Sequence, residues 1–305
     1  MLCRGGRLVH SDDGGSLMDV TQKMLCIYHS NCADGFGAAW AVRAALGDAV
    51  EFYPGVYQKP PPDVAGRDVI LVDFCYKRPI LEQMAAVARS ITILDHHKSA
   101  AEDLRGLPVL ADWHTLGGMP MPGVGAIFDM SRSGAGLAWD YFHPGIPRPA
   151  LINHIEDRDL WRFKIPGTRE IQANLFSYPY DFAAWDRLMA ADVESLRVGG
   201  EAIERKHNKD IAELVALCRR RMVIAGHNVP VASLPYTLAS DAGHLMADGE
   251  HFAACYWDTA DQRIFSLRSS ADGVDVSVVA VFYGGGGHYH AAGFSVPRHH
   301  PLAIG

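Results

Sequence analysis

The first half of the chain alternates short apolar runs, rich in β-branched residues, with longer stretches of helical periodicity. Continuous apolar runs of strand length indicate strands buried on both faces, and their alternation with helices is typical of a parallel sheet. We expect strands at Leu25–His29, Val50–Tyr53, Val69–Phe74, Ile91–Leu94 and Pro108–Leu110. The helices expected around them are Phe36–Leu46, Pro79–Arg89, Gly134–Phe142 and Pro149–Trp161.

The second half begins with a long charged helical stretch, from about Ala190 to Arg221, which we interpret as a connecting helix with a solvated face. A smaller α+β unit follows, with strands expected at 230–234, 252–258, 264–269 and 291–296 and helices at 240–247 and 274–283. The predicted fold is therefore α/β: an N-terminal, mostly parallel sheet with helices on both faces, a connecting helix, and a smaller C-terminal α+β domain. The expected divisions are a flexible extension at 1–23, then 24–185, 186–222 and 223–305.

Charge and composition restrict the partners of this chain. Its 305 residues carry 28 Lys and Arg against 35 Asp and Glu, a net charge of −7. Proteins that coat long duplex nucleic acid usually present a basic face, so we expect no such partner. Short anionic substrates remain compatible if a metal ion supplies local positive charge. No apolar run approaches the ~18–20 residues that span a bilayer. The six Cys show no paired spacing. We therefore expect a cytoplasmic protein with reduced thiols and no membrane partner.

Residues that can bind a metal ion lie at the ends of three predicted strands. They are His29 with Asp34 in the following loop, Asp73, and the run Asp95-His96-His97. Ligands of parallel sheets bind beyond the carboxyl ends of the strands, so these side chains are expected to meet in one cleft. Alone, each Asp is also an ordinary turn or cap residue. Imidazoles combined with carboxylates favour a transition ion such as manganese over calcium.

The C-terminal unit contains a second unusual string, Gly284–Phe294, which opens with four glycines and continues through His288. Successive glycines cost backbone entropy and are typical of places where a backbone approaches something closely. Their free N–H groups can form a concavity that binds anions. Upstream, Arg268 stands at a predicted strand end, where its planar fork could hold a phosphate. The alternatives are a flexible linker for the glycines and a surface ion pair for Arg268.

Together these motifs resemble those of the DHH phosphoesterase superfamily, in its branch with the glycine-rich DHH-associated C-terminal domain. The resemblance rests on Asp95-His96-His97, Asp73, the loop from His29 to Gly35 and the Gly284–Phe294 string, and it covers about residues 24 to 297. It implies a metal-dependent phosphodiesterase or phosphatase that acts on nucleotides by metal-activated water. Residues 24–185 would form the catalytic domain and 223–305 the substrate-binding domain.

The resemblance also implies a role for individual residues. The implied metal ligands are His29, Asp34, Asp73, His96 and Asp157. The implied catalytic residues are Asp73, Asp95 and His97, where Asp95 supports His96 and His97 contacts phosphate. The implied substrate-binding residues are Arg268, Ser269, Gly285, Gly286, Gly287 and His288. The cofactor would be Mn²⁺, expected as two ions, with Mg²⁺ or Co²⁺ as substitutes.

The first motif departs from the family pattern, and the last ligand position is left open between two residues. The first motif of relatives usually has two carboxylates, whereas Asn31 and Cys32 stand where an acid is expected. Either one of them supplements the site, or one ion binds more weakly. Asp159 competes with Asp157 for the last ligand position.

We therefore expect a phosphodiesterase for short oligoribonucleotides or for linear or cyclic dinucleotides, with a homodimer as a compatible assembly. One alternative is a phosphomonoesterase that acts on 3′,5′-bisphosphate nucleotides. An alternative from another class is a non-catalytic nucleotide-binding protein with a degenerate metal site. Trp113, Trp161 and Tyr178 are aromatic residues that could stack on a base, although each alone reads more simply as a core residue.

Overall fold

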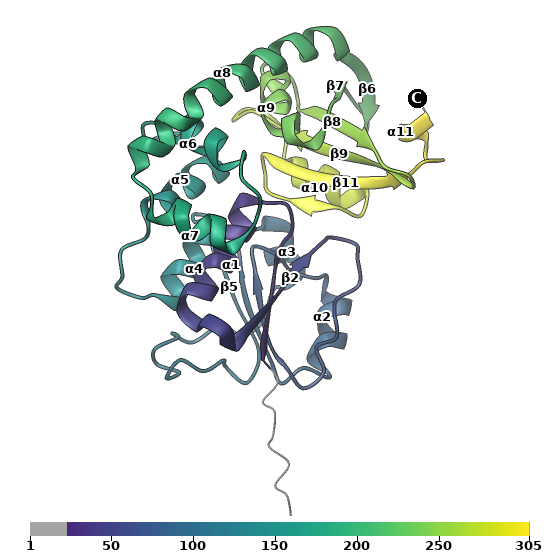
Figure 1. The fold of residues 1–305 in the computed structure, drawn as a ribbon. Coiled ribbons are helices and arrows are strands. Elements are labelled where there is room, and N and C mark those ends of the chain that lie inside the picture. The colour runs from purple at the N-terminus through teal and green to yellow at the C-terminus, as the bar shows by residue number, and fades with distance from the viewer. Residues whose placement is uncertain (1–22, 305) are drawn as a thin grey trace, which may run out of the picture.

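The computed structural model describes residues 23–304, which form two units built around separate sheets and joined by the long helix α8, Val193–Cys218 (Figure 1). The first sheet has the order β2-β1-β3-β4-β5, and every neighbouring pair in it is parallel. Its strands are β1 Met24–His29, β2 Val50–Gly55, β3 Asp68–Val72, β4 Ser90–Asp95 and β5 Gly123–Phe128. The predicted parallel α/β architecture is confirmed.

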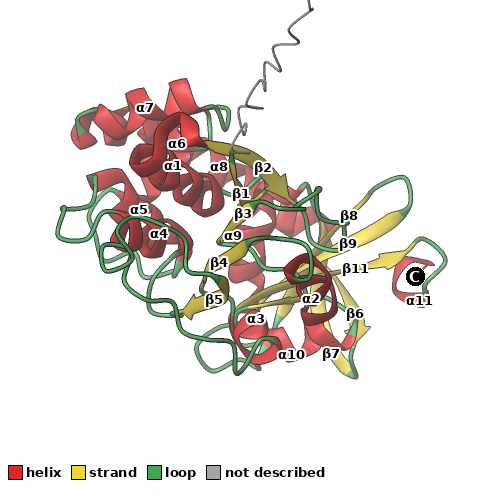
Figure 2. Cartoon of the chain, turned by 90° about the horizontal axis from the view of Figure 1, so that it is seen from below, coloured by secondary structure: helices red, strands yellow, loops and turns green. Residues whose placement is uncertain are grey.

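Helices cover both faces of this sheet. They are α1 Ala33–Leu46, α2 Arg78–Ala85, α3 Lys98–Asp103, α4 Gly134–Phe142, α5 Ala150–Asp159, α6 Thr168–Leu175 and α7 Phe182–Ala190, with a 3-10 turn at Gly47–Ala49. Figure 2 shows α1 and α4 to α7 gathered on one side of the sheet and α2 on the other. Strand β3 shows why the apolar runs are continuous. Ile70 packs into the cluster under α1 and α4 on one face of the sheet, and Leu71 packs into the cluster under α2 on the other.

The fifth strand is not where the sequence predicted it. Val109, at the centre of the expected strand 108–110, is 78 % exposed and forms only one isolated bridge, to Ala126. The strand paired with β4 is instead β5. Its sequence, GVGAIF, carries two glycines, which weaken the local preference for a strand. Pairing along β4 overrides that preference.

The second sheet is mixed and has the order β10-β11-β9-β8-β7-β6. Its strands are β6 Arg220–Ile224, β7 His227–Ser233, β8 Ala253–Asp258, β9 Gln262–Arg268, β10 Gly286–Gly287 and β11 Ala291–Pro297. The helices of this unit are α9 Tyr236–Ala247, α10 Val276–Phe282 and α11 Pro301–Ile304. Strand β6 was not predicted, because its exposed Arg220 and Arg221 resemble the charged helix before it. Among residues 23–304, no helix is both long enough and apolar enough to cross a membrane.

Helix α8 approaches α6 so closely that glycine is required at the contact. A Cβ atom at Gly200 would lie 1.7 Å from the backbone oxygen of Glu170, which cannot rotate away. We expect Gly200→Ala to lower the free energy of unfolding by about 1–3 kcal/mol, although alanine favours a helix over glycine by ~1 kcal/mol. Urea unfolding checks this. At Gly199 the nearest atom to a Cβ, 3.1 Å away, belongs to the Asn174 side chain, so Gly199→Ala is the matched control. Equal losses in both variants would contradict the explanation.

Candidate metal centre and substrate cleft

Three parallel strands bring their carboxyl ends to one edge of the first sheet. His29 is the last residue of β1, Asp73 follows β3, and Asp95 ends β4. The backbone N–H of Asp73 donates to the oxygen of Leu94 at 3.0 Å, which continues the pairing of β3 and β4 by one residue. Asp73 has φ of +52°, a left-handed conformation that aspartate tolerates better than most residues. Sheet pairing and this unusual backbone conformation together hold Asp73 between the ends of β1 and β4.

A first cluster joins Asp34, Asp73 and His96, all of which are buried. The Nε2 atom of His96 lies 3.0 Å from Asp73 Oδ1 and 3.4 Å from Asp34 Oδ2. One ligand atom from each residue lies within 4.8 Å of the others, a spacing at which all three can reach one ion.

A second cluster joins His29, Asp73 and His97 at the same spacing. The Nδ1 atom of His29 lies 3.5 Å from Asp73 Oδ2, and the Nδ1 atom of His97 lies 4.0 Å from Asp73 Oδ1. Asp73 therefore belongs to both clusters. One carboxylate thus lies between two groups of possible ligands, an arrangement that two-metal sites also use.

Asp34 is held by the first residues of helix α4. The backbone N–H groups of Gly134 and Ala135 donate to its two carboxylate oxygens at 2.5 Å and 2.9 Å. A Cβ atom at Gly134 would lie 2.4 Å from the Cβ of Asp73, so only glycine permits this approach. Burial, together with the nearby charge of Asp73, raises the pKa of Asp34 above its usual value. Asp34 thus has a fixed position and a poorly compensated charge, as expected of a ligand for a cation.

Asp95 supports His97 and the backbone rather than the ring of His96. Its Oδ1 atom accepts from the backbone N–H of His96 at 2.7 Å and from the ring Nδ1 of His97 at 2.7 Å. The expectation that Asp95 supports the ligand His96 therefore holds only for that residue's backbone. The contact with His97 leaves the Nε2 atom of that ring available to the cleft.

The last carboxylate of the cluster is Asp159, and Asp157 lies apart from it. Asp157 accepts from the backbone N–H groups of Lys164 and Ile165 at 2.8 Å and 3.0 Å and from Thr168 Oγ1 at 2.7 Å. Its oxygens are thus engaged in closing the loop after α5. Asp159 Oδ2 lies 3.6 Å from His96 Nε2. Asp159, and not the expected Asp157, therefore lies beside His96, since residues two apart on a helix point about 200° apart.

This division of roles gives a testable pair of variants. Asp157→Ala should lower the free energy of unfolding by about 2–3 kcal/mol, because it removes three hydrogen bonds to a buried carboxylate. Asp159→Asn should not lower that free energy in chelator, and should raise it near neutral pH, because it removes a buried acid with a raised pKa. It should also weaken Mn²⁺ binding. Urea unfolding and calorimetric titration with Mn²⁺ measure the two effects. Loss of Mn²⁺ binding in a folded Asp157→Ala protein, with normal binding in Asp159→Asn, would reverse the assignment.

The buried polar atoms of the cleft fit a bound cation. Asp73 Oδ2, Asp159 Oδ2 and His96 Nδ1 have no hydrogen-bond partner among the described residues. Buried polar atoms are rarely left unpaired without a functional reason. Burial opposes ionisation of Asp73, but His29 and His96 outweigh it and hold its pKa well below the usual value. Burial would lower the pKa of His96, but Asp34 and Asp73 raise it well above its usual value. A metal ion bound by these carboxylates and imidazoles would compensate the negative charge of the carboxylates.

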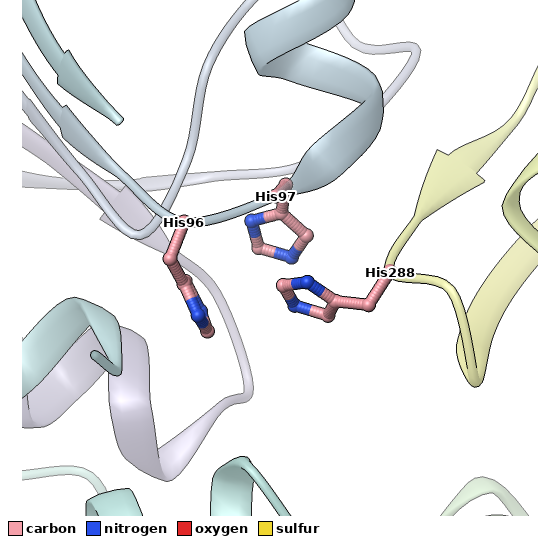
Figure 3. Close-up of side chains that lie close together, drawn as sticks. All are labelled: His96, His97 and His288. Carbon is pink, nitrogen blue, oxygen red and sulfur yellow. The ribbon is translucent and has the colours of Figure 1, made fainter. Parts of the chain in front are cut away.

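The second unit closes over the cleft through the glycine string. The His288 ring lies 4.5 Å from the His96 ring and stacks on His97, with centroids 4.4 Å apart at 19° (Figure 3). The N–H of Gly287 donates to Ser99 Oγ at 2.9 Å, and a Cβ at Gly286 would lie 2.6 Å from the same oxygen. Gly285 is equally restricted, since its Cβ would lie 2.0 Å from the oxygen of Gly293. The glycines therefore permit the close approach of backbone that the sequence suggested.

Arg268 ends β9 without a carboxylate partner among the described residues. Its guanidinium donates to the hydroxyl groups of Ser240 and Ser266, at 3.2 Å and 3.0 Å, and burial and the charge of Arg158 lower its pKa to about 10. Ser269 is buried and its hydroxyl lies 3.0 Å from His290 Nδ1, so it holds the turn of the glycine string. The ion-pair alternative for Arg268 is thus not what the structure contains.

The unusual first motif adds no carboxylate besides Asp34. Asn31 is exposed and has φ of +53°. Cys32 precedes α1 as its N-cap, and burial, with the charges of Asp73 and Asp159, raises the pKa of its thiol well above the usual value. A thiol must lose its proton to bind a metal ion, so Cys32 is a poor ligand without further help.

Fold and site together define a two-unit α/β protein with a His/Asp cluster at one sheet edge, covered by a glycine-rich turn. No family model matches the chain. The chain is 29 % identical over 307 residues to the uncharacterized protein R106 of Acanthamoeba polyphaga mimivirus. The alignment covers 92 % of this chain and 69 % of that protein.

Three solved structures are similar in fold at low identity. The pGpG-specific phosphodiesterase PggH of Vibrio cholerae is 13 % identical with a TM-score of 0.45, and the match covers 90 % of this chain and 94 % of that one. RecJ of Thermus thermophilus, in complex with Mn²⁺, has the same identity and TM-score, covering 90 % of this chain and 49 % of that one. An exopolyphosphatase-related protein of Bacteroides fragilis is 14 % identical with a TM-score of 0.40, covering 93 % and 89 %. The chain resembles the DHH phosphoesterase superfamily in its motifs.

Proposed function

We propose that this chain is a metal-dependent phosphodiesterase that hydrolyses short oligoribonucleotides or linear or cyclic dinucleotides. The observation that carries the proposal is the pair of His/Asp clusters that share Asp73 and face the His288 turn of the second unit. The metal ligands would be His29, Asp34, Asp73, His96 and Asp159, and the ions would be two Mn²⁺, with Mg²⁺ or Co²⁺ as substitutes. When bound, such ions lower the pKa of a coordinated water and neutralise phosphate charge.

The chain's own residues would bind and orient the phosphate. Asp95 fixes the ring of His97 through Nδ1. Burial would lower the pKa of His97, but Asp95 and Asp73 raise it, so the protonated ring can donate from Nε2 to a phosphate oxygen. Burial and the neighbouring rings of His97 and His96 hold the pKa of His288 well below its usual value, so this imidazole is neutral and can donate one hydrogen bond. Arg268, with no carboxylate partner among residues 23–304, would supply a fixed positive charge to a second phosphate or the far end of the substrate.

A substrate panel tests the proposal. Purified protein is incubated with linear and cyclic dinucleotides, a 3′,5′-bisphosphate nucleotide and a longer oligonucleotide, each with Mn²⁺, Mg²⁺ or chelator. Release of mononucleotide from a dinucleotide, dependent on the metal, is the expected result. Release of inorganic phosphate from the bisphosphate alone would favour the phosphomonoesterase alternative. Tight binding of dinucleotide without turnover in any metal would favour the non-catalytic alternative.

A further inference from the structure

Tyr57 lies beside the metal centre with part of its ring open to solvent. It follows β2 at the carboxyl edge of the sheet, and its ring centroid lies 5.2 Å from that of His29 and 6.1 Å from that of His97. Both histidines belong to the second cluster around Asp73. As a residue Tyr57 is 43 % exposed, although His29, Phe74 and His97 pack against its ring. A planar ligand beside the cluster would meet this aromatic surface.

The ring is held in place by a buried neighbour and by the loop that carries it. Phe74, which is fully buried, packs against it with centroids 4.8 Å apart at 38°. The next residue, Gln58, has φ of +67° and is bound to the second unit, since its Oε1 accepts from Ser295 Oγ at 2.7 Å and its Nε2 donates to the oxygen of Gly284 at 3.5 Å. Because the position of Tyr57 is preorganised, little conformational freedom would be lost when a ligand stacks on it.

The three aromatic residues that the sequence offered for base stacking make no ring contact with His29 or His97 among those of the described residues. Trp113 is 5 % exposed and packs on Phe142 in the core. One face of Trp161 is covered by His244, with centroids 3.7 Å apart at 16°. Tyr178 is as exposed as Tyr57, at 43 %, which makes it the natural comparison.

We propose that Tyr57 is a nucleobase platform, so that the site takes phosphoesters carrying a base in preference to phosphate compounds without one. This inference rests on the proposed function, which already names nucleotide substrates, and adds the side chain that would recognise their base. Stacking on an aromatic side chain is tolerant of base identity, because every base has a π-face. The platform therefore distinguishes nucleotides from polyphosphates and sugar phosphates without selecting one base.

The test compares two ligands that differ only in the base, guanosine 5′-monophosphate and ribose 5-phosphate. Each is titrated calorimetrically into the Mn²⁺-loaded protein. The wild-type protein should bind the nucleotide more tightly, and Tyr57→Ala should lose about 5- to 100-fold of nucleotide affinity with ribose 5-phosphate binding unchanged. Tyr57→Phe should keep the preference. Tyr57→Leu should lose it while retaining apolar volume, which separates stacking from packing. Tyr178→Ala is the matched control and should behave as wild type.

Several outcomes would overturn the platform. The first is an unchanged preference for the nucleotide in both Tyr57→Ala and Tyr57→Leu. The second is an equal loss of affinity for both ligands in these variants. The third is a loss of the preference in Tyr178→Ala instead. If the wild-type protein binds the two ligands equally, phosphate binding stands and the nucleobase platform fails. If the wild-type protein binds neither ligand with Mn²⁺, the proposed function fails, and the platform with it.

Discussion

Replacing Asp73 with asparagine should reduce metal-dependent hydrolysis of dinucleotides by about 10³-fold or more, since loss of mere outer partners of a metal site already costs ~10–100-fold. Asp73 contributes to both clusters, so one substitution removes charge from both ion positions. Asparagine has the same shape and also tolerates the left-handed φ of +52° at this position. The protein should therefore stay folded. Steady-state kinetics, with calorimetric titration of Mn²⁺, measure the two losses.

Two further variants make this result interpretable. Asp73→Ala should lose the same activity, with an added cost in stability because alanine disfavours positive φ. Asp186→Asn is the surface control, since Asp186 pairs with Arg43 and Trp40 and belongs to neither cluster. Unchanged turnover in a folded Asp73→Asn protein would refute the assignment of the shared carboxylate.

Removal of metal ions by a chelator should abolish turnover, and Mn²⁺ should restore it. The same ions should stabilise the fold by about 2.7 kcal/mol when present at 100 times their dissociation constant. The physical reason is that the buried carboxylates of Asp34 and Asp73 repel each other beside a single His96 Nε2 atom, and that Asp73 Oδ2 has no hydrogen-bond partner among the described residues. Activity assays and thermal unfolding, with and without Mn²⁺, check both effects. Full activity after exhaustive chelation would contradict the metal centre.

The binding of Mn²⁺ should also depend on pH through Asp159. Burial, together with the charge of Asp34, raises the pKa of Asp159 to about 7. A carboxyl with a raised pKa stays protonated in the metal-free fold until the pH exceeds that value, and an ion must displace the proton. Mn²⁺ affinity should therefore rise as the pH increases from about 6 to about 8. The raised pKa also affects stability. Protonated Asp159 is tolerated in the metal-free fold, so the metal-free protein loses stability as the pH rises through about 7 and the acid ionises. Asp159→Asn should flatten this dependence.

Local patterns in the sequence predicted most of the first sheet and the residues at its edge. Apolar runs such as Val69–Val72 are buried on both faces, so their strand character is visible in the residues themselves. His29, Asp73 and His96 follow such runs directly, and parallel pairing then brings them to one edge. The prediction of a shared cleft needed only these two facts.

Other features depended on contacts between distant segments. The fifth strand forms because Gly123–Phe128 pairs with β4, although two glycines weaken its local signal. The third carboxylate beside the cluster is Asp159, because the loop at Lys164 and Ile165 supplies N–H groups to Asp157 and occupies it. Residue type cannot decide between the two acids, since both are aspartates on one helix.

By itself, the sequence of this protein determined which residues are buried in strands and which metal-binding side chains end those strands, because both follow from short-range patterns and parallel pairing. Only the tertiary structure decided which acid faces the cluster, that Asp95 holds the ring of His97, and that Tyr57 stands beside His29. Each of these depends on loops and on a second unit far along the chain, whose docking through His288 and Gln58 is specified by packing between distant segments.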